Sequence, residues 1–136
     1  MTRLDEFLLA DKQQTDFLSF CNAIGWDCKG LFAGQLTLCE LEANNAEELV
    51  AGYKSMIRAI FYGEDFTLQD GKQFETPVHM YIEVLLVLTF KQNVAVIADA
   101  PEMAYFFGLI RSNVREAVIQ NVGESDKELI NKWIKD

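Results

Sequence analysis

The chain has 136 residues, the length of one domain, and half of its residues are hydrophobic, which excludes an intrinsically disordered chain. Its formal net charge of −9 argues against direct binding to nucleic acid and against anionic membranes, since both need a basic patch. We therefore expect a single globular domain over residues 1–136.

The first third of the chain predicts a helix and then a strand. Residues 4–24 have helical spacing, with a break near residues 11–14, and Gly25 is suited to the left-handed turn that ends a helix. Trp26 is then expected to pack back on the helix end. Residues 35–43 alternate as in a strand, although neither face is purely apolar.

The next two segments predict a helix and a hairpin. Residues 44–62 form a helix in this interpretation, capped by Asn44 or Asn45, with Glu47 and Glu48 in the first turn, where the helix dipole favours carboxylates. Residues 66–75 then fit a hairpin around Asp70-Gly71. A three-residue loop there places Phe66 opposite Phe74.

The most apolar run of the chain, residues 77–90, is expected at the centre of the core. Its valine and isoleucine content favours a central strand covered on both sides, paired through residues 91–93 with a strand over residues 94–98. A helix is the alternative, because Thr76 is a suitable N-cap and Pro77 would occupy the first helical position.

Two helices complete the chain. Asp99 caps the first of them, and Gly108 inside it is expected at a close helix contact. Gly123 ends it, and Ser125 with Glu128 forms a capping box for a short last helix. The predicted fold is therefore α+β: an antiparallel sheet with its central strand near residues 78–90, covered by N-terminal, middle and C-terminal helices. A mostly α-helical fold is the alternative.

The candidate pocket lies around His79, the single histidine, which shares a strand face with Tyr81 and Glu83. In a helix His79 and Glu83 would still be neighbours. An imidazole beside a carboxylate is the pattern of a general base, so a small enzyme or ligand-binding domain is one hypothesis. A hydrogen-bonded polar group without catalytic function is the simpler interpretation.

Cys21, Cys28 and Cys39 match neither a zinc site nor a redox pair in their spacing, so we predict reduced thiols, no metal and no cofactor. The N-terminus lacks the apolar segment of a secretory signal, and no uninterrupted apolar run reaches the length of a bilayer span. We therefore expect a cytoplasmic chain without membrane contact.

Negative charge is concentrated in the first third of the chain. The candidate partner-binding residues are nine acids: Asp5, Glu6, Asp11, Asp16, Asp27, Glu40, Glu42, Glu47 and Glu48. Together with the absence of a catalytic motif, they favour a non-enzymatic module that binds a basic protein, as an inhibitor, immunity protein or chaperone-like partner does. A structural subunit of a homodimer or larger homo-oligomer is a further alternative.

Overall fold

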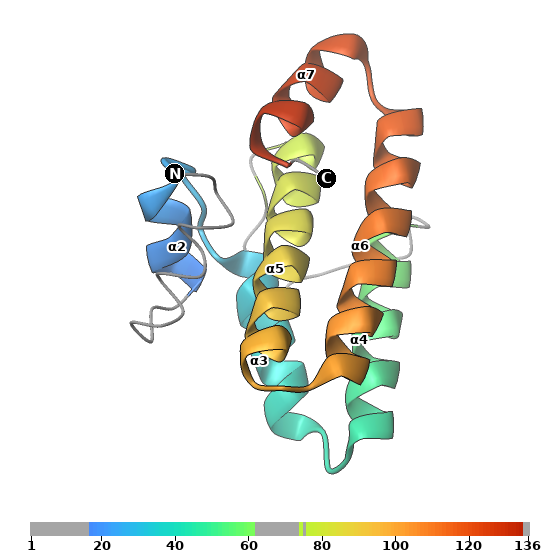
Figure 1. Cartoon of the computed structure of the whole chain (residues 1–136). Helices are drawn as coiled ribbons and strands as arrows, with labels where there is room; N and C mark the ends of the chain where they lie inside the picture. Colours follow the sequence, from blue (N-terminus) through green and yellow to red (C-terminus); the bar gives the residue numbers. More distant parts are fainter. Residues whose placement is uncertain (1–16, 62–73, 75, 135–136) are drawn as a thin grey trace.

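The computed structural model describes residues 17–61, 74 and 76–134, and this part of the chain is all-α, with six helices and no strand (Figure 1). Labelled as in Figure 1, the helices are α2 (Phe17–Ala23), α3 (Leu31–Glu42), α4 (Ala46–Phe61), α5 (Pro77–Ile97), α6 (Pro101–Asn121) and α7 (Glu124–Trp133).

The predicted sheet is wrong, and the helical alternative is the arrangement found. The central apolar run lies in α5, where the Thr76 side chain accepts a hydrogen bond from the His79 amide and Pro77 takes the first helical position. Seven consecutive residues, 82–88, are buried. A helix enclosed on all sides loses its 3.6-residue apolar period, so its pattern resembles that of a buried strand.

The other strand predictions fail in the same way. Residues 35–43 lie almost entirely in α3, and residues 94–97 are the last turn of α5. Valine-rich and alternating segments lose their strand preference when tertiary packing stabilises a helix. The predicted hairpin over residues 66–75, except for Phe74, lies outside the described residues, and so do residues 4–16 of the helix predicted over residues 4–24.

The helices α3, α4, α5 and α6 run alternately down and up in Figure 1. Phe32 contacts Glu83, and Glu40 pairs with Lys91; each pair is separated by 51 residues, so α3 and α5 run parallel without a change of register. In α6, Arg111 Nε donates to Thr89 Oγ1 of α5 at 2.5 Å, and α6 runs back along α5. Tyr53 of α4 packs on Phe107 of α6, with ring centroids 5.4 Å apart.

Two glycines face side chains of a neighbouring helix. A Cβ at Gly52 of α4 would overlap Cys39 Sγ of α3, and a Cβ at Gly108 of α6 would overlap the Gln92 side chain of α5. The predicted close helix contact at Gly108 is therefore confirmed.

Helix ends show which turn predictions hold. Gly25 has a φ of 78°, and the Trp26 amide donates to Cys21 O at 2.9 Å, so the predicted left-handed end of α2 is confirmed. The predicted cap of α4 is also confirmed, because Asn45 Oδ1 accepts from the Glu48 amide at 2.9 Å.

The predicted caps of the last two helices are wrong. Asp99 does not cap α6. Instead it ends α5 in a left-handed conformation, with a φ of 57°. The Ala100 amide then donates to Ala95 O at 2.8 Å, as in a Schellman motif. Helix α7 begins at Glu124, before the predicted capping box, and Gly123 is its N-cap residue.

Among the described residues, α5 is long and apolar enough to span a membrane by length and composition alone, with a mean hydropathy of 1.5. The expectation that no uninterrupted apolar run reaches that length is not contradicted by this, because Glu83 and Lys91 interrupt the apolar residues of α5. The core helix of a folded domain passes the same test, and α5 lies against α3, α6 and α7. Its buried carboxyl, Glu83, is satisfied by α3 and its preceding loop.

Candidate functional site

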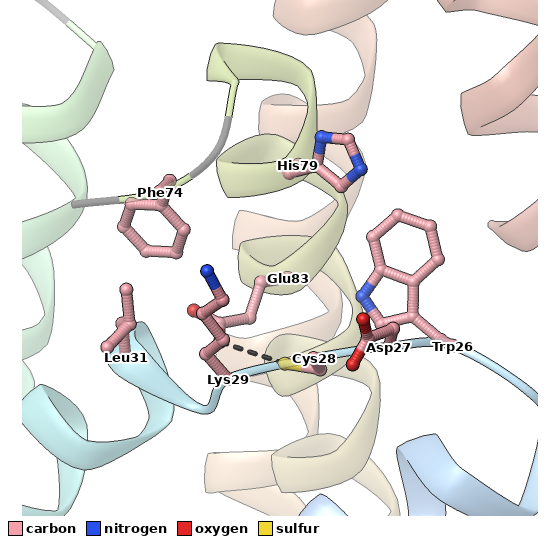
Figure 2. A pocket seen from close by; sticks show the side chains of 8 residues that line it. All are labelled: Trp26, Asp27, Cys28, Lys29, Leu31, Phe74, His79 and Glu83. Carbon is pink, nitrogen blue, oxygen red and sulfur yellow. Dashed lines mark hydrogen bonds between the residues drawn. The ribbon is translucent and has the colours of Figure 1, made fainter.

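A small cavity lies where the first turns of α3 and α5 meet the segment between α2 and α3 (Figure 2). Its volume is about 20 Å³, which is room for about one water molecule. Eight residues line it: Trp26, Asp27, Cys28, Lys29, Leu31, Phe74, His79 and Glu83.

Glu83 is the polar centre of this region and is only 2% exposed. Its Oε2 accepts a hydrogen bond of 2.6 Å from the Phe32 amide, and its Oε1 accepts from Cys28 Sγ at 2.9 Å. Helix α3 has no side-chain cap of its own, because its N-cap residue is Gly30 with a φ of 69°. Glu83 of α5 therefore caps α3 from outside, where the helix dipole favours a carboxylate.

Cys28 connects this cap to the end of α2. Hydrogen bonding with Cys21, burial, and the neighbouring Glu83 together raise the pKa of the Cys28 thiol far above its ordinary value. The thiol therefore stays protonated and donates to the carboxyl group. A nucleophilic cysteine needs a lowered pKa, so this environment disfavours covalent chemistry at Cys28.

Burial also raises the pKa of the Glu83 carboxyl, although hydrogen bonds from Cys28 and from the amides of Phe32, Leu31 and Gly30 oppose that shift. Removing a carboxylate from water is expensive, and the first amides of a helix recover part of that cost. The cluster therefore binds α5, α3 and the preceding loop together through one ionisable group.

His79 borders the cavity and is held by its neighbours. Its ring stacks on Trp26 with centroids 5.3 Å apart, and Nδ1 hydrogen-bonds Thr76 Oγ1. Trp26 in turn packs on Trp133 of α7, also at 5.3 Å. The Cys28 thiol donates to Glu83 rather than to an imidazole, so the groups are not arranged as a cysteine–histidine catalytic pair.

Within the described residues, no three His, Cys, Asp or Glu side chains are grouped so that they could hold a metal ion. Cys39 lies apart from Cys28, against Gly52 of α4. Burial, and then the charges of Glu40 and Glu42, raise the pKa of its thiol.

Of the three predicted pocket residues, the structure brings His79 and Glu83 to the cavity but not Tyr81. One helical turn separates the first two, whereas a residue two positions on points to another side of the helix. Sequence reasoning missed Cys28 as a partner of Glu83 and Trp26 as a partner of His79. No local signal joins them, because the contact between Cys28 and Glu83 spans 55 residues.

Five of the nine predicted partner-binding acids lie within the described residues, and these five are divided between the two ends of α3. Asp5, Glu6, Asp11 and Asp16 lie outside the described residues. Asp27 lines the cavity, and Glu40 pairs with Lys91. Glu42, Glu47 and Glu48 are exposed around the turn between α3 and α4, at the opposite end of α3 from the cavity (Figure 1).

Comparison with known proteins identifies no relative: no protein-family model, no curated protein and no solved structure matches the chain.

Proposed function

We propose that this chain is a non-catalytic protein-binding module that acts on a basic protein as an inhibitor, immunity protein or chaperone-like partner. The cavity supports this proposal indirectly. It has room for about one water molecule, and its carboxyl group is engaged in capping α3. A substrate site is normally several hundred Å³ in volume.

The observation that carries the proposal is a set of large apolar side chains exposed on the outside of the molecule. Leu41 is 78% exposed and Tyr105 is 73% exposed. Further members are Leu18, Leu38, Val96, Ile97 and Leu109. Single exposed apolar residues are common, but on a chain with a net charge of −9 they add an apolar component to a surface that attracts positive charge.

Reconstitution tests the proposal. Proteins that co-purify with the full chain are identified, and each is then purified and titrated against it at low and at physiological ionic strength. We expect a stoichiometric complex with a basic protein that weakens as salt rises, because charge complementarity is screened. The proposal would be contradicted if no purified candidate binds the chain. It would also be contradicted if the affinity does not change with salt concentration.

A further inference from the structure

The end of the bundle that carries the α3–α4 and α5–α6 turns differs in charge from the other described residues. We call residues 41–48 and 96–102 the turn end. The parallel register of α3 and α5 brings their last turns to similar heights, because Glu40 lies beside Lys91. The contact between Tyr53 and Phe107 likewise brings the first turns of α4 and α6 to similar heights. In Figure 1 both turns lie toward the lower end of the bundle, with the α5–α6 turn above the α3–α4 turn.

This register gathers acids from two distant parts of the sequence. The exposed carboxylates of the turn end are Glu42, Glu47, Glu48, Asp99 and Glu102. No lysine or arginine occurs in residues 41–53 or in residues 92–110. The nearest cation along α5, Lys91, is paired with Glu40.

Apolar side chains accompany these acids. Leu41 at the end of α3 is 78% exposed, and Val96 and Ile97 at the end of α5 are 58% and 46% exposed. Because Glu40 lies beside Lys91, Leu41 is level with residue 92 of α5, and Val96 follows about one helical turn further along α5. The turn end therefore offers apolar contacts within a negatively charged surface.

We infer that the partner docks on the turn end through a basic segment whose apolar side chains contact Leu41, Val96 and Ile97. This inference rests on the proposed function and names the surface and the chemistry of its partner. Exposed apolar residues bordered by one sign of charge favour a partner of the opposite sign, since the charges steer association and the apolar contacts hold it. A second copy of the chain is disfavoured, because two turn ends would repel each other.

Two charge variants with equal change in net charge test the location. The first neutralises the turn end with Glu42→Gln, Glu47→Gln, Asp99→Asn and Glu102→Gln, and keeps Glu48, which accepts hydrogen bonds from Asn44. The matched control carries Glu116→Gln, Glu124→Gln, Asp126→Asn and Glu128→Gln, on the second half of α6 and on α7. The probes are two amphipathic helical peptides with the same leucine face, one with lysines and one with glutamates on the polar face.

Fluorescence anisotropy of the labelled peptides gives the readout. We expect the lysine peptide to bind the wild type, the turn-end variant to bind it about 10-fold more weakly, and the control variant to stay within about 2-fold. We also expect Val96→Ser with Ile97→Ser to weaken binding more than Leu109→Ser, which alters an exposed leucine beyond the turn end.

Three other outcomes would contradict the docking site, the basic partner or the proposed function. Equal weakening in both charge variants would show a general charge effect and remove the turn end as the docking site, while leaving the proposed function intact. Equal binding of the lysine and glutamate peptides would remove the basic partner. No binding of the lysine peptide by the wild type, together with failure of the reconstitution experiment, would overturn the proposed function itself.

Discussion

The carboxylate of Glu83 accepts a hydrogen bond of 2.6 Å from the backbone amide of Phe32, so the central helix α5 caps the first turn of α3. The two residues lie 51 positions apart, and Glu83 is buried. Several properties of the molecule follow from this contact and from the close packing around it.

Removing the Glu83 side chain should be costly. Glu83→Ala leaves the Phe32 amide and the Cys28 thiol without their acceptor in a buried place, so we expect a loss of about 2–4 kcal/mol in the free energy of unfolding. Urea denaturation measures the loss. Glu116→Ala, on the exposed face of α6, serves as the control and should stay within about 0.5 kcal/mol.

Stability should also depend on pH through Glu83. Burial raises the pKa of this carboxyl above its ordinary value of 4.5, so the carboxyl binds its proton more tightly in the folded chain than in the unfolded chain. Its stabilising contribution is complete below the unfolded pKa and is lost as pH rises through the folded pKa. Since Glu83→Gln has no proton to lose, the wild type should lose stability relative to this variant as pH rises. Denaturation of both proteins from about pH 4 to about pH 8 measures the difference. If the wild type instead gains stability relative to Glu83→Gln as pH rises, the hydrogen bonds from the α3 amides outweigh the cost of burying the carboxylate.

Cys28 should react slowly with alkylating agents although it borders the cavity. Hydrogen bonding with Cys21, burial, and the nearby Glu83 carboxyl raise the pKa of its thiol, and the thiolate is the reactive form. We expect iodoacetamide to modify Cys28 in the folded protein at least about 10-fold more slowly than in the unfolded chain. Peptide mass spectrometry after timed quenching measures this ratio. Fast modification at neutral pH would contradict the protonated thiol.

Asp99→Gly should stabilise the protein. Asp99 adopts a left-handed backbone conformation that glycine takes without steric cost, so we expect a gain of about 0.5–1 kcal/mol in the free energy of unfolding. Asp99→Ala is the matched control, because it removes the same charge but keeps the Cβ. Thermal and urea unfolding should show a higher free energy of unfolding for Asp99→Gly and no such gain for Asp99→Ala.

Two glycine substitutions in neighbouring helices should have opposite effects. Gly52→Ala brings a Cβ into overlap with Cys39 Sγ. We therefore expect the free energy of unfolding to fall by about 1–3 kcal/mol, despite the better helix propensity of alanine. In α3, a Cβ at Gly34 meets no atom within 4 Å, so Gly34→Ala should raise the free energy of unfolding by about 0.5–1 kcal/mol. Adding Cys39→Ala to Gly52→Ala should recover part of the loss. No recovery would place the strain elsewhere.

Local chemistry made several features predictable. Gly25 ends α2, Asn45 caps α4, and Gly108 lies at a helix contact, each because the residue type itself has a strong backbone or hydrogen-bonding preference. The helical neighbours His79 and Glu83 were also foreseeable as lining one pocket, but Trp26 and Cys28 were not.

By itself, the sequence determined that residues 77–90 would lie in the core and that the surface would be acidic. Only the tertiary structure decided that this core segment is a helix, because burial on every side erases the periodicity that distinguishes helix from strand. It also decided which carboxylates lie at the turn end. Asp99 and Glu102 join Glu42 and Glu47 through the register of packed helices, which depends on contacts between residues about fifty positions apart.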